Sequence, residues 1–213
     1  MKKNGRRFKP MAENPYNSPS PTTVSGMRIG LLGGSFNPAH QGHRFISIAA
    51  LERLGLDQVW WLVAPQNPLK SEDSLAPLKT RLAGAEKVSK EKNILVMNLE
   101  GPLGFEFTVD TLGFLKAQYP QTHFIWLMGA DCLGELHKWK SWEKIMTSIP
   151  LGVFSRPGYE AAALGGKAAT HYKKYRVMEE KFKSLVVTEP PAWGYIGIEG
   201  QDISGTRLRA KAS

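Results

Sequence analysis

The feature that most constrains the fold is an alternation of short apolar runs with segments of helical period, which begins near Met27 and continues past residue 120. Apolar runs of about four to eight residues that end at glycine, proline or polar residues are typical of strands buried on both faces. Such runs predict strands at residues 27–32, 58–64, 94–97 and 123–128.

Helical segments are expected between these runs, because apolar residues recur there three or four positions apart. The pattern predicts helices at 41–54, where Gly55 ends the period, at 77–88 and at 108–119. The apolar faces predicted for the three helices are Phe45, Ile48, Leu51 and Leu54; Leu78, Leu82, Ala85 and Val88; and Val109, Leu112 and Leu115.

The alternation predicts the fold class α/β, as a doubly wound, Rossmann-like parallel sheet with helices on both faces, because right-handed crossovers place helices there. In such sheets ligands bind beyond the carboxyl ends of the strands. The turns after Leu32, Ala64 and Met128 are therefore expected to face one another across a cleft. Further along the chain we expect a strand at 151–154, partly helical structure at 161–182 and a last short strand at 194–198.

The first 26 of the 213 residues differ from the rest in composition. Five of them are basic and one, Glu13, is acidic, so this segment carries a net +4 of the formal charge of +9. It is rich in Asn, Pro and Ser and has no helical or strand period, so we expect 1–26 to be a disordered basic tail and 27–213 to be one catalytic domain. A nucleic-acid-binding arm is an alternative, but a tail without function, or a translation start assigned upstream of Met27, is favoured.

The compartment is inferred from two features of composition. No apolar run approaches the roughly 20 residues that a membrane helix needs, so we expect no membrane partner. The lone cysteine, Cys132, cannot form an intramolecular disulfide, which favours a reducing compartment, and we expect the protein in the cytoplasm. A catalytic thiol is an alternative role for Cys132. A lone cysteine is more often a small, buried apolar residue, so we assign Cys132 no chemistry.

The segment after the first expected strand is a candidate phosphate site. Gly33 and Gly34 lack side chains, so the backbone there is expected to turn sharply and to approach a ligand closely. Ser35 and Phe36 then offer main-chain N–H groups, which suit an anion. The spacing of Gly30, Gly33 and Gly34 does not match G-x-G-x-x-G, which argues against a nicotinamide-dependent dehydrogenase.

Two histidines, His40 and His43, follow three residues apart at the start of the first expected helix. They would share one face near the positive end of the helix dipole, and an imidazole N–H can stabilise charge that builds on phosphate oxygens. Gly42 between them leaves room for a triphosphate at the helix end. The spacing by itself leaves open the alternative of two surface histidines.

In context, this segment closely resembles the nucleotidylyltransferase superfamily. The order of a strand, G-G-S-F-N-P, H-Q-G-H and a helix matches that superfamily, and I-S-G-T-R-L-R at 203–209 is similar to the I-S-x-T-x-x-R segment that closes its site. Ser204 can cap a short helix, Thr206 can donate a hydroxyl and Arg209 can bind phosphate oxygens bidentately, although this segment alone would suggest only a capped basic C-terminus. The resemblance implies that the catalytic residues are His40, His43 and Arg209, and that ATP is bound by Gly33, Gly34, Ser35, Phe36, His43, Ser204, Thr206 and Arg209.

Three further segments narrow the resemblance. M-G-A-D at 128–131, L-H-K-W at 136–139 and F-T at 107–108 resemble the bacterial nicotinate mononucleotide adenylyltransferases, and the likeness extends over residues 27–209. It implies a substrate site at Gly129, Asp131, Trp139 and Thr108. Asp131 would hold ribose hydroxyls, Trp139 would stack on the pyridine ring, and main-chain N–H groups near Thr108 would meet the nicotinate carboxylate.

Two of these residues also have an alternative role: Asp131 as a helix cap and Trp139 as a packing residue, the role we expect for Trp142. Lys70 lies in N-P-L-K, where the family commonly reads Pro-His-Lys, and the resemblance implies that its ammonium binds substrate phosphate. Other departures from the family are Ser35 and Asn37, in place of Thr and Asp, and a chain that ends four residues after Arg209, which predicts a short last helix.

The resemblance implies transfer of AMP from ATP to nicotinate mononucleotide, giving deamido-NAD and pyrophosphate in NAD biosynthesis. Mg²⁺ would accompany ATP, and no metal ligands are assigned to the protein. A phosphate monoester with a second pKa of about 6 is largely dianionic at neutral pH, so no nucleophilic side chain is needed. Nicotinamide mononucleotide, phosphopantetheine or a phosphoalcohol with CTP are alternative substrates, and a nucleic-acid-binding module that uses the basic tail is the alternative from another class.

Overall fold

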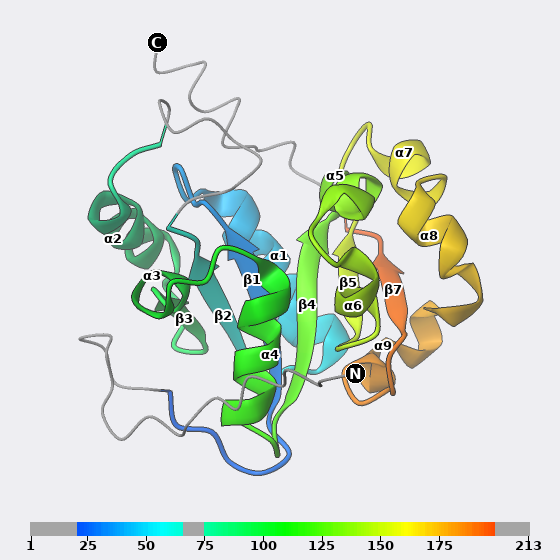
Figure 1. The fold of residues 1–213 in the computed structure, drawn as a ribbon, viewed down its shortest axis with the longest axis horizontal. Coiled ribbons are helices and arrows are strands. Elements are labelled where there is room, and N and C mark those ends of the chain that lie inside the picture. The colour runs from blue at the N-terminus through cyan, green and yellow to red at the C-terminus, as the bar shows by residue number, and fades with distance from the viewer. Residues whose placement is uncertain (1–20, 66–74, 199–213) are drawn as a thin grey trace, which may run out of the picture.

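The computed structural model describes residues 21–65 and 75–198. They contain one seven-stranded sheet in the order β3-β2-β1-β4-β5-β7-β6, in which every neighbouring pair is parallel (Figure 1). The strands are β1 Arg28–Gly34, β2 Gln58–Val63, β3 Ile94–Met97, β4 His123–Gly129, β5 Leu151–Phe154, β6 Arg176–Val177 and β7 Trp193–Ile196.

The helices alternate with these strands. They are α1 Gln41–Leu54, α2 Leu78–Val88, α3 Glu100–Leu103, α4 Thr108–Gln118, α5 Ala130–Glu135, α6 Trp142–Met146, α7 Glu160–Leu164, α8 Lys167–His171 and α9 Phe182–Leu185, with 3-10 turns η2 Leu136–Lys138, η3 Lys173–Tyr175 and η4 Glu179–Lys181. The predicted α/β class is confirmed, and the strands and long helices begin and end within two residues of their predicted bounds. The short elements α3, α5, α6 and β6 were not predicted.

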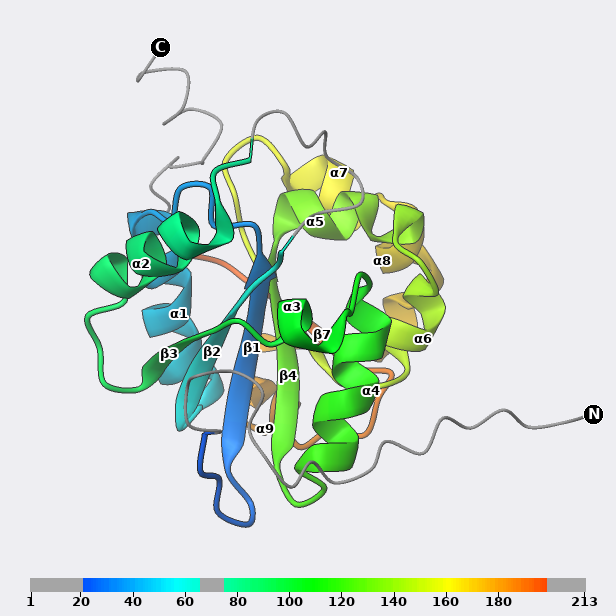
Figure 2. The same ribbon diagram turned by 60° about the vertical axis from the view of Figure 1, so that its left-hand side comes forward.

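The sheet separates two hydrophobic cores. Figure 2 shows α1 and α2 on one side of the strands and α4 and α6 on the other. Successive strand residues point to opposite faces, so Trp60 belongs to the core under α4 and Trp61 to the core under α1. Both indole side chains are fully buried. The continuous apolar strand sequences follow from this arrangement, because a parallel sheet between two helical layers has no solvent-facing side.

The strand order reverses between β1 and β4. The chain builds β1, β2 and β3 in one direction, then returns to place β4 on the other side of β1 and continues outward to β5. Crossover connections diverge at such a switch point and leave a crevice beyond the carboxyl ends of the two central strands. The segments that follow β1 and β4 are those with the candidate site residues.

The glycines after the first apolar run do not form the predicted turn. Both Gly33 and Gly34 continue β1 and pair with β2, and the chain turns afterwards, at Asn37 and Pro38. Gly33 is needed for packing, because a Cβ there would lie 2.4 Å from Cη2 of Trp126 on β4. The expectation of a sharp bend at these glycines was therefore wrong; Gly33 instead allows close packing of β1 against an indole ring.

The buried face of α1 also differs from the prediction. The fully or nearly fully buried residues are Ser47, Ala49, Ala50 and Leu54, whereas Phe45 is 40% exposed. The small side chains bring the helix close to the sheet, and Ser47 is buried because its hydroxyl has partners there. Only Leu54 of the predicted apolar face is fully buried.

The start of the described chain is attached to the domain. The N–H of Gly26 donates to the carbonyl of Gln121, at a distance of 2.8 Å.

In the part of the chain that the structure describes, no helix is both long and apolar enough to cross a membrane.

Candidate active site

The first group of site residues lies between β1 and α1. His40 is the N-cap of α1 in an extended conformation, and His43 occupies the third helical position. Their ring centroids are 3.8 Å apart. The spacing of three residues thus brings the two imidazoles into contact at the helix N-terminus, beside the carboxyl end of β1. The alternative of two unrelated surface histidines does not fit this arrangement.

One hydrogen bond defines which nitrogen of His43 can donate. The backbone N–H of His40 donates to Nδ1 of His43, at a distance of 3.2 Å. A neutral imidazole that accepts at Nδ1 carries its proton on Nε2. His43 therefore offers an Nε2–H donor, which is the group required to stabilise negative charge on a phosphate oxygen.

A buried serine fixes the backbone of His43. Trp61 Nε1–H on β2 donates to Ser47 Oγ at 2.7 Å, and Ser47 Oγ donates to the carbonyl oxygen of His43 at 2.9 Å. The Phe36 ring packs on the other side, with its centroid 4.6 Å from that of His43 and 5.1 Å from that of Trp61. His43 is thus held by its backbone, its ring and its Nδ1.

Both histidines are neutral at physiological pH. Burial, with a contribution from the positive charge of Arg156, lowers the pKa of His40 to about 4. Burial, together with the charges of His40 and Arg156, lowers the pKa of His43 to about 3. Neutral imidazoles can donate a hydrogen bond without a change of protonation state, so they suit electrostatic stabilisation better than proton transfer.

Asp131 and Arg156 form the second group of site residues. Asp131 lies in the first turn of α5, directly after β4, and its carboxylate forms an ion pair with Arg156, which follows β5. Gly129 leaves room for this carboxylate, since a Cβ at Gly129 would lie 2.4 Å from Oδ1 of Asp131. Arg156 also lies over the ring of Tyr159. Because Arg156 also affects the pKa of both histidines, it links the groups that follow β1, β4 and β5.

Arg156 was missed in the sequence, although a signal for it was present. It follows the strand predicted at 151–154 by two residues, and a cation beyond the carboxyl end of a parallel strand is a candidate partner for an anionic ligand. The sequence alone could not show that its guanidinium lies against Asp131, 25 residues away.

Trp139 and Thr108 define the third group, on the α4 side of the sheet. Trp139 packs edge-on against Trp126 with centroids 6.4 Å apart, and Trp126 in turn covers Gly33 of β1. Thr108 is the first residue of α4, where the first N–H groups have no partner within the helix. Lys140 Nζ lies 3.9 Å from the ring centroid of Phe107, which places the residue after Trp139 beside the N-terminus of α4.

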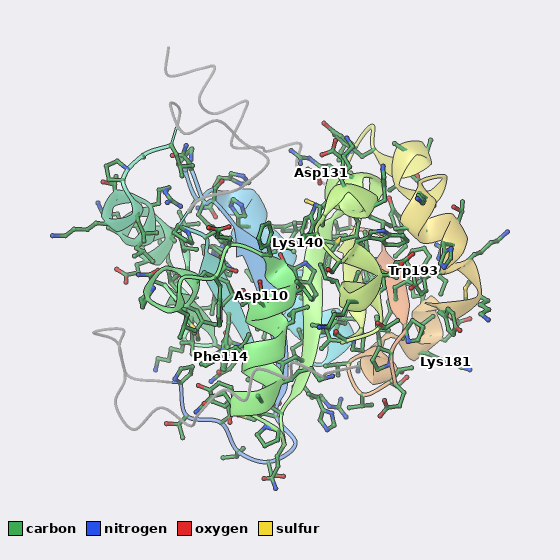
Figure 3. All side chains as sticks on the ribbon, viewed as in Figure 1. Asp110, Phe114, Asp131, Lys140, Lys181 and Trp193 are labelled. Carbon is green, nitrogen blue, oxygen red and sulfur yellow. The ribbon has the colours of Figure 1, made fainter. Side chains whose placement is uncertain are left out.

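Figure 3 shows this arrangement from the α4 side. Asp131 lies on α5 above the end of β4, and Lys140 and Asp110 lie near the upper, N-terminal end of α4. The structure therefore brings together His40, His43, Gly129, Asp131, Trp139 and Thr108 at one edge of the sheet. Four predicted site residues, Lys70, Ser204, Thr206 and Arg209, lie outside the described residues.

The chain is held at β5 where it leaves the described region. Ser155 Oγ donates to the carbonyl of Ile198 at 3.1 Å and accepts from its N–H at 2.8 Å. Ser155 is the neighbour of Arg156, so Ile198, the last described residue, lies beside the candidate site.

The donors of the site are suited to binding an anion. Among residues 21–65 and 75–198 no group of three or more His, Cys, Asp or Glu side chains is placed to hold a metal ion. Asp131 is already paired with a cation, and the imidazoles of His40 and His43 face each other at the helix N-terminus. Uncharged donors and one guanidinium at the end of a parallel sheet are suited to phosphate groups.

This combination of a switch-point crevice, a helix N-terminus with two neutral histidines and an adjacent arginine defines a nucleotide-binding α/β protein. The chain belongs to the family described as cytidylyltransferase-like, whose model matches residues 31–211. Its curated relatives include proteins named probable nicotinate-nucleotide adenylyltransferase from Methylorubrum extorquens, 44% identical over 87% of this chain and 100% of the relative, and from Rhizobium johnstonii, 44% identical over 91% and 97%. A third, from Cereibacter sphaeroides, is 45% identical over 86% and 97%. The resemblance to this group that the sequence indicated is confirmed.

Solved structures support the fold. The nicotinic acid mononucleotide adenylyltransferase of Plasmodium falciparum complexed with NaAD superimposes with a TM-score of 0.64 at 17% identity, over 86% of this chain and 83% of the other. The same enzyme complexed with APC gives a TM-score of 0.62 over the same shares. At this identity the likeness shows the fold alone, a Rossmann-like α/β fold.

Proposed function

We propose that this protein is a nicotinate-nucleotide adenylyltransferase, which transfers AMP from ATP to nicotinate mononucleotide and forms deamido-NAD and pyrophosphate in NAD biosynthesis. The relatives of that name, at 44% identity over most of the chain, support the assignment. The structural observation that carries it is the neutral His40 and His43 pair at the N-terminus of α1, next to the ion pair of Asp131 and Arg156.

The reaction is an in-line displacement at the α-phosphorus of ATP. An oxygen of the 5′-phosphate of nicotinate mononucleotide forms a bond to that phosphorus, while the bond from the phosphorus to the oxygen bridging to the β-phosphate breaks and pyrophosphate leaves. The attacking phosphate is already largely dianionic, so no side chain needs to remove a proton. Catalysis then depends on alignment of two anions and on stabilisation of the charge between them.

We assign the phosphate end of the site, residues 33–43, to ATP. His43 would donate its Nε2–H to an oxygen of the α-phosphate, and His40 and the main-chain N–H groups of Ser35 and Phe36 would bind neighbouring oxygens. Gly33 and Gly34 would contribute indirectly, because they are the last two residues of β1 and position the segment that follows. Arg156 is near enough to both histidines to affect their pKa, and it would bind phosphate when substrate displaces it from Asp131.

We assign the pyridine end of the site, formed by Thr108, Gly129, Asp131 and Trp139, to nicotinate mononucleotide. Asp131 would accept hydrogen bonds from ribose hydroxyls, and Trp139, held edge-on against Trp126, would stack on the pyridine ring. The main-chain donors at the start of α4 would bind the nicotinate carboxylate. Lys70, Ser204, Thr206 and Arg209 remain proposed phosphate and ATP partners on the strength of the family pattern.

The members of this family generally use a divalent metal with ATP, and we propose Mg²⁺ for this chain. The side chains present fit an ion carried by the phosphates, because Asp131 is paired and His43 uses Nδ1 for a backbone hydrogen bond. When bound, the ion would supply charge neutralisation of the leaving pyrophosphate. The protein's own residues would orient the two nucleotides.

The decisive experiment measures pyrophosphate release from ATP in three parallel reactions, with nicotinate mononucleotide, nicotinamide mononucleotide and phosphopantetheine as acceptors. We expect the first to react with the highest kcat/KM. Release only with phosphopantetheine, or with none of the three, would reject the assignment.

We further propose a cytoplasmic location and a tail, residues 1–26, that is dispensable for the reaction. Because Gly26 is bonded to Gln121, the first truncation to test removes residues 1–20. Unchanged turnover of that truncated chain supports a catalytic domain without the tail; loss of turnover with an intact fold favours the nucleic-acid-arm alternative or another role for the tail.

A further inference from the structure

A buried arginine without a carboxylate partner connects three segments behind the phosphate end. Arg81 lies on α2, and its side chain is 3% exposed. Its guanidinium donates to four backbone carbonyls and forms no ion pair within the described residues. The bonds run from Nε to Ala76 at 2.8 Å, from Nη1 to Ser35 and Ala64 at 2.7 Å each, and from Nη2 to Pro65 at 2.7 Å.

We propose that Arg81 is a positioning residue for adenylyl transfer: its guanidinium fixes the turn after β1 and thereby fixes the ring of His43. This inference rests on the proposed function, since it assigns Arg81 a role at the same site. The hydrogen bonds that Arg81 forms within the described residues go to backbone carbonyls and not to the histidines; it acts through the backbone of Ser35 and the ring of Phe36.

The shape of the guanidinium suits this task. A buried charge is costly unless its hydrogen bonds are satisfied, and here four N–H donors meet four carbonyl oxygens. The carbonyls belong to Ser35, directly after β1, to the two residues that follow β2, and to Ala76, two residues before α2. Only the rigid fork of an arginine reaches all of them, because a lysine ammonium donates from one point.

The turn that Arg81 holds has a strained residue beside His43. Phe36 has a φ of +46°, in the left-handed region that few residues other than glycine adopt, and it is 1% exposed. Such a conformation persists only where surrounding contacts enforce it. The carbonyl oxygen of the preceding residue, Ser35, is tied to Arg81, and the Phe36 ring packs against both His43 and Trp61.

Two further hydrogen bonds hold the same turn. The N–H of Ala76 donates to Oδ1 of Asn37 at 3.2 Å, and the N–H of Ala64 donates to the carbonyl of Gly34 at 2.9 Å. Arg81 also binds the carbonyls of residues 64 and 76, so its loss would loosen both ends of this support at once. The Phe36 ring would then no longer bury His43 in one position.

The test compares Arg81→Lys and Arg81→Ala with the control Arg44→Lys. Arg44 is next to His43 on α1, but it binds Glu91 at the surface. For Arg81→Lys we expect kcat to fall on the order of 10–100-fold, since small displacements of a catalytic group are costly. By NMR, we expect the pKa of His43 to rise from about 3 toward its ordinary value, because the imidazole becomes more hydrated. Arg44→Lys should change neither quantity.

Chemical rescue separates the charge and shape of Arg81 from a general loss of stability. Guanidinium added to Arg81→Ala is expected to restore part of the turnover in a saturable way, whereas urea, which is uncharged and of similar shape, is not. A folded Arg81→Lys with wild-type kcat and an unchanged His43 pKa would overturn the proposal, as would equal effects of guanidinium and urea.

If neither Arg81 variant folds, Asn37→Ala provides the second test, because it loosens the same turn without exposing a buried charge. We expect the same direction of change in kcat and in the His43 pKa, and no change in either would overturn the proposal. The His43 titration needs no substrate. A wild-type protein that releases no pyrophosphate with any acceptor would therefore reject the proposed function, while the positioning of His43 by Arg81 would still be measured.

Discussion

At the phosphate end of the site the functional side chains come from one short segment, whereas at the pyridine end they come from separate parts of the chain. His40 and His43 share a helix start and are held by bonds to backbone, Ser47 and Phe36. Asp131 and Trp139 follow β4, Thr108 begins α4, and their main structural contacts are a salt bridge and ring edges. The two histidines of the first end are uncharged and rigidly supported; the second end is assembled by the tertiary fold and includes a charged carboxylate.

This difference predicts that the phosphate end determines the rate of the chemical step and that the pyridine end determines substrate selectivity. Stabilisation of a transition state needs donors that do not move during the reaction, which the supported histidines provide. Selection of one nucleotide substrate over another needs contacts that only the correct substrate makes. A few side chains on separate elements can supply such contacts. Variants at the phosphate end should therefore change kcat, and variants at the pyridine end should change KM.

The largest effect is expected for His43→Ala. Loss of one preorganised donor to the transferring phosphate should lower kcat by about 10²–10³-fold, with little change in the KM of nicotinate mononucleotide. Steady-state kinetics of the variant measures both. His123→Ala, which alters an exposed histidine at the other end of β4, is the matched control. Wild-type kcat in His43→Ala would remove this residue from the mechanism and abolish the contrast between the two ends.

A smaller effect, on KM instead of kcat, is expected for Trp139→Ala. Stacking of a base on an aromatic ring is worth about 1–3 kcal/mol, so the KM for nicotinate mononucleotide should rise about 5–150-fold. Trp139→Phe should keep part of the affinity. Trp142→Phe is the control, because Trp142 packs on His171 and Tyr172. If Trp139→Ala lowers kcat and leaves KM alone, the assignment of the two ends is reversed.

The acid stability of the fold tests the neutral state of the histidine pair. Both native pKa values lie below the ordinary 6.5, so the unfolded chain takes up protons first as the pH falls. Their contribution is complete above pH 6.5 and is lost as the pH falls from there toward about 3 to 4. Each proton gives a slope of about 1.4 kcal/mol per pH unit in the free energy of unfolding.

Urea titrations of wild type and His43→Gln between pH 7 and pH 4 isolate this term. The variant should have a shallower loss of stability on acidification, by about one proton. The variant must be compared with the wild type because Glu100 also affects the pH dependence of stability. Burial raises the pKa of Glu100, so its protonation stabilises the fold as the pH falls, and this contribution cancels in the difference between the two chains. Identical slopes would mean that His43 is not buried in its neutral form.

The smallest effect is expected for Lys140→Met. Its ammonium lies at the N-terminus of α4, where the nicotinate carboxylate is expected, and an exposed charge pair contributes about 0.2–1 kcal/mol. The KM for nicotinate mononucleotide should rise about 1.5–5-fold, while that for nicotinamide mononucleotide should stay unchanged. Lys144→Met is the control on the same segment. An equal change with both substrates would place Lys140 outside the pyridine end.

Much of the fold could be predicted from the sequence because its signals are local. The apolar runs gave the strands, and Gly55, in the left-handed C-cap conformation, marked the end of α1. The helices α3, α5 and α6 have four to six residues, less than two turns, so a helical period cannot be detected in them.

The features that could not be predicted depend on partners distant in the chain. Ser47 is buried because Trp61 donates to it, and Arg81 is buried because carbonyls of three segments accept from it. The same holds for the pairing of Asp131 with Arg156. Motif spacing located the histidines, Asp131 and Trp139, but it carried no information about the supports that orient them.

The packing of Trp126 on Gly33 has a consequence for how sequences of this kind can diverge. An indole occupies the space in which a side chain at position 33 would lie, so the two positions share one fixed volume although they are distant in the chain. A methyl group at residue 33 becomes tolerable only after residue 126 has become smaller, and the reverse order of substitution passes through a clash. The order of substitution at these two sites is therefore constrained. Related chains should have a small residue at one of the two positions and a large residue at the other, and should not have large residues at both.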